Sequence, residues 1–111
     1  MSDEPVDLTN LRELTGGDEE METELFLEFL SSAREAIAIL EQNCLDGEND
    51  DWRRATHALK GTSLSLGAER LSQICKTGQE KQGSDTEEKS EILTGIKAEF
   101  QKVEAFLDGF L

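Results

Sequence analysis

The residues of this chain best suited to chemistry lie close together on one helical segment. His57 is the only histidine in the 111 residues, Lys60 follows three positions later, and Gly61 comes next. A neutral imidazole is a competent nucleophile near pH 7, because its unperturbed pKa is about 6.5. A glycine one turn away leaves bare backbone, over which a bulky group can approach the ring closely. The pattern predicts a nucleophilic imidazole that a second molecule reaches from solvent.

The helical phase of this segment predicts that His57 faces water. With Trp52 at zero on a wheel turning about 100° per residue, the apolar set Trp52, Ala55, Leu59, Thr62 and Leu66 centres near about 315°. His57 then falls near about 140°, almost opposite the core. The other residues on that face are Asp50, Arg53, Arg54, Lys60, Gly61 and Leu64.

Gly61 is the member of this set that is hardest to explain by structure alone. Glycine within an exposed helix costs on the order of 1 kcal/mol relative to alanine. Gly61 lies in the middle of the segment, away from either cap. An exposed leucine such as Leu64 is ordinary by itself, but beside His57 and Gly61 it fits a docking surface.

The segment 57–61, His-Ala-Leu-Lys-Gly, resembles the His-x-Leu-Lys-Gly signature of histidine-containing phosphotransfer (HPt) domains, the carriers of multistep His-to-Asp phosphorelays. The match continues through Thr62-Ser63 and Leu66-Gly67-Ala68 to Leu71, and spans about 20 residues, from Ala55 to Cys75. The resemblance implies a four-helix bundle that presents an exposed, phosphorylatable histidine.

The resemblance assigns roles to the residues around His57. His57 would accept the phosphoryl group from a receiver-domain aspartate and pass it to another, and Lys60 would offset charge on the phosphoryl oxygens. Gly61 would give steric access, and Arg53, Arg54 and Leu64 would dock the partner. Thr62 and Ser63 are expected off the histidine face, without a catalytic role.

The resemblance also suggests which partners and cofactors to expect. The partners would be response-regulator receiver domains and a hybrid sensor kinase, with magnesium bound in the receiver. We expect no cofactor or metal site in this chain, which we take to be a monomer and a phosphoryl carrier without ATP-dependent kinase activity. It has neither the length nor the motifs of an ATP-binding kinase domain.

The apolar periodicity predicts an all-α protein, an antiparallel up-down-up-down four-helix bundle with a short extra N-terminal helix. The expected helices cover residues 7–14, 18–45, 51–66, 68–81 and 86–109. Asp50 or Asp51 is expected to cap the third helix, and Ser84 with Glu87, or Asp85 with Glu88, has capping-box spacing before the last.

The second and last helices carry the most regular apolar stripes. The stripe of the second is Phe26, Leu30, Ala33, Ile37, Leu40 and Cys44, and that of the last is Leu93, Ile96, Phe100, Val103, Leu107 and Phe110. Gly78 in the fourth helix departs from the family that the chain resembles, because a larger apolar residue is expected there, and we predict weaker packing of that helix. Residues 1–111 are read as one domain, with residues 1–6 loose.

Charge limits the classes of partner. Eleven Lys and Arg stand against 25 Asp and Glu, a net charge of −14, which argues against nucleic acid and anionic membranes. The stretch 52–76 is different: its five basic residues against Glu69 alone give a net of +4. That local charge suits an anionic phosphoryl group and an acidic partner site.

No apolar run approaches a membrane span, the N-terminus has no signal-peptide pattern, and we expect a cytoplasmic protein.

Two other functions stay open on the sequence. The chain could be the phosphoacceptor (P1-like) domain of a chemotaxis-type histidine kinase, in which the donor is an ATP site. It could also be a non-catalytic helical bundle that only binds partners, although Lys60 and Gly61 beside His57 speak against that.

Overall fold

A computed structural model of the chain describes residues 4–111, and this part of the chain contains five helices and no strand. The helices are α1 (Thr9–Thr15), α2 (Glu19–Gln42), α3 (Asp50–Leu66), α4 (Glu69–Glu80) and α5 (Thr86–Asp108). Every expected helix is present, with ends that differ from the predicted ones by at most three residues. The all-α prediction is confirmed.

Side-chain caps start the three long helices. The carboxylates of Asp18 and Asp85 accept the backbone N–H of Met21 and Glu88, as residues before a helix commonly do. At α3 the cap is the Asn49 side chain, which accepts from the N–H of Trp52 at 2.9 Å. The prediction of Asp50 or Asp51 as the cap is therefore wrong by one or two residues.

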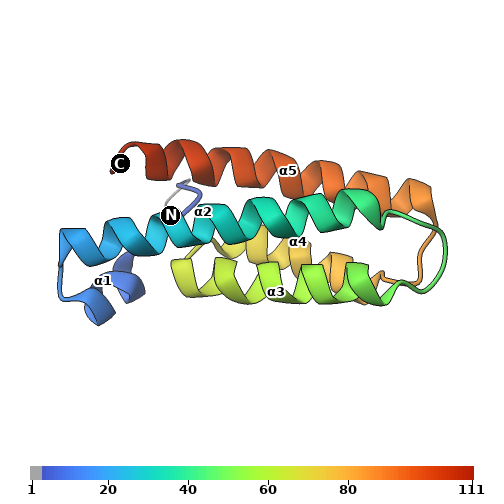
Figure 1. Cartoon of the computed structure of the whole chain (residues 1–111), viewed down its shortest axis with the longest axis horizontal. Coiled ribbons are helices and arrows are strands. Elements are labelled where there is room, and N and C mark those ends of the chain that lie inside the picture. The colour runs from blue at the N-terminus through green and yellow to red at the C-terminus, as the bar shows by residue number, and fades with distance from the viewer. Residues whose placement is uncertain (1–3) are drawn as a thin grey trace.

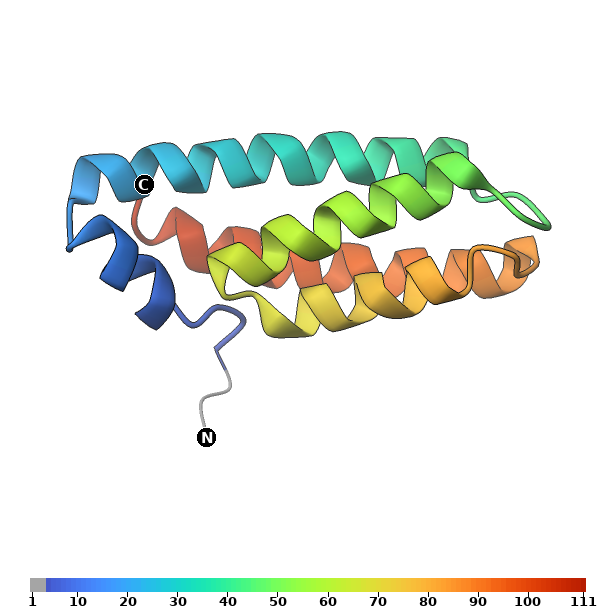
Figure 2. The same ribbon diagram turned by 90° about the horizontal axis from the view of Figure 1, so that it is seen from below.

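Helices α2 to α5 run up and down in sequence, and each packs against two neighbours around a ring (Figure 1). The α2–α3 and α4–α5 connections lie together at one end of the bundle, and the α3–α4 turn lies at the other (Figure 2). Short α1 sits at that second end, beside α2 and α3 (Figure 2). The predicted four-helix bundle with an extra N-terminal helix is confirmed.

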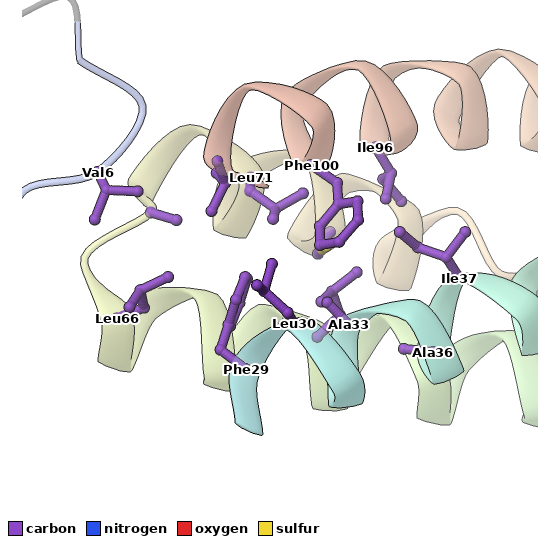
Figure 3. Close-up of a cluster of buried hydrophobic side chains, with 14 of the residues drawn as sticks. Val6, Phe29, Leu30, Ala33, Ala36, Ile37, Leu66, Leu71, Ile96 and Phe100 are labelled. Carbon is purple, nitrogen blue, oxygen red and sulfur yellow. The ribbon is translucent and has the colours of Figure 1, made fainter. Parts of the chain in front are cut away.

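The core contains most residues of the two expected stripes, together with Phe29, which neither stripe included. Phe29, Leu30 and Ala33 of α2 face Ile96 and Phe100 of α5 across the centre of the bundle (Figure 3). Two stripe members are less buried than predicted: Cys44 is only half-buried, and Phe110 is exposed although its ring lies 5.9 Å from that of Phe26. Both lie at or beyond helix ends, where fewer neighbours cover them.

The N-terminal segment is more firmly packed than expected. Residues 1–3 lie outside the described part of the chain, but Val6 is 2% exposed, so the prediction of a loose end does not hold at that residue. The N–H of Asp7 donates to the carbonyl of Gly67 at 2.9 Å. A Cβ on Gly67, whose φ is +98°, would lie 1.9 Å from the Asp7 carbonyl oxygen, so this crossing requires glycine.

Ion pairing and burial also tie α1 to the bundle. The hydroxyl of Thr15 donates to the buried carboxylate of Glu22 at 2.9 Å, and Arg12 lies 3.7 Å from the same carboxylate. Leu11 is buried against α2 and α3, whereas Leu14, one turn later, is 83% exposed. The first helix therefore has one packed side and one apolar residue in solvent.

Gly78 lies at a close contact between α3 and α4. A Cβ at Gly78 would lie 3.1 Å from Thr56 Cγ2 and 3.2 Å from Ile92 Cγ2, and the Gly78 carbonyl accepts the indole N–H of Trp52 at 2.8 Å. The prediction that Gly78 weakens the packing of the fourth helix is therefore wrong. The missing side chain lets the two backbones approach, and a larger residue would not fit.

The buried side of α3 is rotated towards α4 relative to the expected one. Ser63 and Thr56 are fully buried, while Thr62, expected in the core, is exposed. The reason is the extensive packing of α3 against α4, which draws its buried stripe to that side. His57 stays outside this buried stripe, on the solvent-facing side of α3.

A buried cation holds the loop between α2 and α3. The ammonium of Lys89 donates to the carbonyls of Leu45 and Gly47 at 2.6 Å each and lies 5.7 Å from the centre of the Trp52 ring.

No helix within residues 4–111 has both the length and the apolar character needed to cross a membrane.

Candidate functional site

His57 projects from the exposed side of α3, as the helical phase predicts, and makes one side-chain hydrogen bond within residues 4–111. Its Nδ1 lies 3.2 Å from Nε2 of Gln79, a half-buried residue of α4. Nε2 of the ring has no hydrogen-bond partner among residues 4–111. The contact thus leaves the outer nitrogen free for an incoming group.

Two arrangements satisfy the contact between Gln79 and His57, because an amide turned by 180° exchanges its oxygen and nitrogen. When the amide nitrogen donates to Nδ1, the neutral ring carries its proton on Nε2. When the amide oxygen accepts from Nδ1–H, the lone pair lies on Nε2. Only the second arrangement makes the outer nitrogen a nucleophile.

Lys60 lies one turn after His57 and is anchored through its backbone. Its carbonyl accepts the hydroxyl of Ser72 from α4 at 3.1 Å, while its ammonium forms no ion pair within the described chain. The cation is therefore available to a negatively charged group brought to this side of α3.

Gly61 has the open surroundings that its proposed use requires. A Cβ built there would meet nothing within 4 Å. Packing therefore does not explain this glycine, and alanine would suit the helix better. Gly61 and Gly78 have opposite surroundings, since only the second is confined by neighbouring atoms.

Arg53 and Arg54 are both paired with Asp50, one turn nearer the start of α3. Each guanidinium lies 2.7 Å from an oxygen of that carboxylate. The hydrogen bond from Arg53 lowers the pKa of Asp50 below its usual value. Exposed pairs of this kind add little to stability and exchange partners readily, so both arginines stay accessible to an acidic partner.

A groove of about 540 Å³ runs along the α2–α3 face and includes His57 in its lining. Besides His57, it is lined by Leu11 of α1, by Leu25, Glu28, Phe29 and Ser32 of α2, and by Ala58, Gly61, Thr62, Ser65 and Leu66 of α3. Leu64 is 61% exposed and does not line the groove, so it stands apart from the other members of the predicted site.

Sequence reasoning missed two of these neighbours. Gln79 lies 22 positions from His57, and the two side chains meet only because α3 and α4 pack side by side. No local sequence pattern points to Gln79 as a neighbour of His57. Thr62 was assigned to the core side of the segment, but it lines the groove with His57. The same rotation of α3 that buries Ser63 brings Thr62 to this surface.

No group of three or more His, Cys, Asp or Glu residues within 4–111 is arranged to hold a metal ion. The carboxylates are numerous but dispersed over the helix surfaces.

In a comparison with protein families, the model of the Hpt domain matches residues 24–106 of the chain. The chain belongs to the Hpt domain family. The matched region contains α3, α4, most of α2 and nearly all of α5 of this Hpt domain, whereas α1 lies outside it. Hpt domains are phosphocarriers, not kinases; they transfer phosphoryl groups on histidine in phosphorelays and interact with the receiver domains of response regulators. No curated protein and no solved structure matches this Hpt domain.

Proposed function

We propose that this Hpt domain carries a phosphoryl group on His57, accepting it from one receiver-domain aspartate and passing it to another. The observation that carries the proposal is the exposed His57 ring, held at Nδ1 by Gln79 while Nε2 is free. It is the only histidine of the chain.

The transfer is a substitution at phosphorus. The Nε2 lone pair of His57 attacks the phosphorus of the receiver's acyl phosphate, and the N–P bond forms as the bond from phosphorus to the aspartate oxygen breaks. The bonding electron pair leaves with the carboxylate. Gln79, with its amide oxygen towards the ring, stabilises the Nδ1 proton as the ring becomes more positive. The reverse sequence of bond changes returns the group to a receiver.

Two neighbours of His57 would assist this step without taking part in bond formation. The Lys60 ammonium would offset charge on the phosphoryl oxygens. Gly61 would let the partner's backbone come close enough for in-line attack. Arg53, Arg54 and Leu64 would meet the partner outside the reacting atoms, and the arginines would exchange Asp50 for acidic groups of the partner.

The remaining partners and conditions belong to the same proposal. The receiver would bind the magnesium ion needed for its own aspartate chemistry, and this chain would act as a monomer without a cofactor. The first phosphoryl donor would be the receiver of a hybrid sensor kinase. The exchange would occur in the cytoplasm, where ATP supplies the first phosphoryl group of a relay.

The decisive experiment compares the wild-type chain with His57→Gln after incubation with a phosphorylated receiver domain. Acid-labile phosphate is expected on the wild type alone. Label that survives in His57→Gln would sink the assignment. A parallel incubation with ATP and a chemotaxis-type kinase core tests the other phosphoacceptor role, and labelling only in that reaction would replace the relay proposal.

A second variant tests steric access. Gly61→Gln is expected to slow transfer by at least about 10-fold, since small misplacements of reacting groups are costly. The fold should persist, because the space at Gly61 is open. A transfer rate equal to that of the wild type, in a folded variant, would refute the access role.

A further inference from the structure

Most cations of this chain are held by its own acidic or carbonyl groups. Within residues 4–111, the Lys89 ammonium is bound by two loop carbonyls. Seven more of the 11 Lys and Arg residues form ion pairs with Asp or Glu: Arg12, Arg34, Arg53, Arg54, Lys81, Lys97 and Lys102. The cations without a partner in this part of the chain are Lys60, Arg70 and Lys76. They all belong to α3 and α4, the two helices that meet at the His57–Gln79 contact.

Lys76 lies on the side of α4 that packs against α3 at the site. It follows Ser72 by four positions and precedes Gln79 by three, so neighbouring Cβ atoms of the three residues are about 5–6 Å apart. Ser72 donates to the carbonyl of Lys60 at 3.1 Å. Gln79 places its Nε2 3.2 Å from Nδ1 of His57. Lys76 therefore stands between the two points at which α4 contacts the site, and its side chain is exposed.

Arg70, the other unpaired cation of α4, lies on a different side of the helix. It precedes Lys76 by six positions, which corresponds to a rotation of about 240° around the helix axis. With Glu99 of α5 it lines a separate cavity of about 370 Å³ between α4 and α5. The same helix thus has one unpaired cation beside His57 and one directed away from it.

We propose that Lys76 binds the phosphoryl group on His57 together with Lys60, so that the anion lies between one ammonium from α3 and one from α4. The inference rests on the proposed function, because it concerns the phosphorylated form of His57. A phosphoryl group presents three strong acceptor oxygens, which two ammonium groups can share. A lysine has a compact charge on a flexible four-carbon stem, and this suits a cation that approaches from the neighbouring helix.

The two lysines favour the phosphorylated form because they act on both states of the chain. Before transfer, two like charges without counterions raise the free energy of the site. Glu80, one turn after Lys76, forms no ion pair with it. After transfer, each ammonium gains an anionic partner and a charge-assisted hydrogen bond. Loss of Lys76 should therefore shift the equilibrium from phosphohistidine towards the aspartyl phosphate of the receiver.

The equilibrium constant of transfer separates binding of the phosphoryl group from contact with the partner protein. The full chain is mixed with a receiver domain that has been phosphorylated with acetyl phosphate and freed of this donor. The ratio of phosphohistidine to aspartyl phosphate is measured when it no longer changes. A residue that only contacts the receiver changes the forward and reverse rates by the same factor, and this ratio stays the same.

Lys76→Gln is expected to lower the equilibrium constant by about 5-fold, the upper end of the range for an exposed charge pair. The loss should shrink in about 1 M salt, which screens exposed charges. Lys76→Arg keeps the charge and should stay within about two-fold of the wild type. The matched control is Arg70→Gln, which removes the same charge from another side of α4 and should change the constant by less than about 1.5-fold.

The remaining outcomes contradict the proposal in different ways. An equilibrium constant unchanged in Lys76→Gln would overturn it, even if transfer became slower, because Lys76 would then contact only the partner. Equal losses in Lys76→Gln and Arg70→Gln would overturn it as well, since the net charge of the chain would then account for both. Absence of label on His57 in the wild type would instead contradict the proposed function.

Discussion

Helix α3 meets its two neighbours in opposite ways. Towards α4 the backbones are close, because Gly78 has no side chain and its carbonyl accepts the indole N–H of Trp52. Towards α2 the surface opens into a groove of about 540 Å³, and Gly61 borders it with free space around the Cα. Two glycines on adjacent helices therefore have opposite surroundings, one confined by neighbouring atoms and one open.

This difference between the two sides of α3 corresponds to two separate requirements of a phosphoryl carrier. The nucleophile must keep a defined orientation, and a partner protein must reach it. The α3–α4 interface meets the first requirement, since it brings Gln79 within 3.2 Å of His57. In the proposed function, the α2–α3 face meets the second. Changes on the first side should therefore alter stability and ring orientation, and changes on the second should alter access.

The largest effect is expected from Gly78→Leu, which introduces the larger apolar residue that the sequence pattern favours. Even a Cβ would lie 3.1 Å from Thr56 and 3.2 Å from Ile92. Overpacking at such a site costs about 1–3 kcal/mol, occasionally more, and we expect a loss of about 3 kcal/mol. Chemical denaturation measures the change in the free energy of unfolding.

The control for this prediction is Gly95→Ala in α5, where a Cβ would make ordinary contacts of 3.8 and 4.0 Å with Ile74. Alanine there should preserve or raise the stability, because it favours the helix. Equal stability of Gly78→Leu and the wild type would show that α3 and α4 are not closely packed, and would remove the contrast between the two sides.

Gln79→Leu is expected to have the next largest effect, on transfer rather than on folding. It removes one hydrogen bond to His57, worth about 0.5–1.5 kcal/mol, and the rate should fall by about 3- to 10-fold. The nitrogen-15 chemical shifts of the ring should also move, because the loss of a partner at Nδ1 changes the balance of tautomers.

Gln73→Leu is a matched control on the same helix, since Gln73 is exposed on α4 and its side chain makes no contact with His57. It should change neither the rate nor the ring shifts. If Gln79→Leu behaves like this control, the α3–α4 interface does not orient the nucleophile.

Much of this arrangement is predictable from local pattern. Apolar residues repeating every three or four positions, as from Phe26 to Leu40, indicate a helix and its buried side. A polar residue opposite such a stripe is exposed, which is how the position of His57 follows from that of Trp52. These inferences need only the geometry of a single helix.

The parts that could not be predicted depend on distances between helices. Whether Gly78 loosens or tightens packing depends on how near Thr56 and Ile92 come, which no single-helix pattern contains. That Ser63 is buried while Thr62, expected in the core, is exposed depends on how α3 divides its contacts between its neighbours α2 and α4. The burial of Lys89 likewise requires the carbonyls of a loop more than 40 residues away.

A smaller effect, of opposite sign, is expected from Gly61→Ala. The new methyl group meets no atom within 4 Å, and the helix gains about 0.5–1 kcal/mol from replacing glycine in its interior. Chemical denaturation should show this gain. A loss of stability would mean that Gly61 is confined as Gly78 is, and the two sides of α3 would no longer differ.

The smallest effect concerns thiol reactivity and tests whether α4 stays packed against the rest of the bundle. Burial raises the pKa of the Cys75 thiol, on α4, to about 12, so almost no reactive thiolate forms at pH 8. Iodoacetamide should therefore modify the native chain once, at half-buried Cys44, and should leave Cys44→Ser unmodified. Mass spectrometry counts the adducts, and a second adduct appears only when denaturant opens the core. Rapid double modification of the native chain would mean that α4 separates from the bundle often, and a helix that separates could not hold Gln79 against His57.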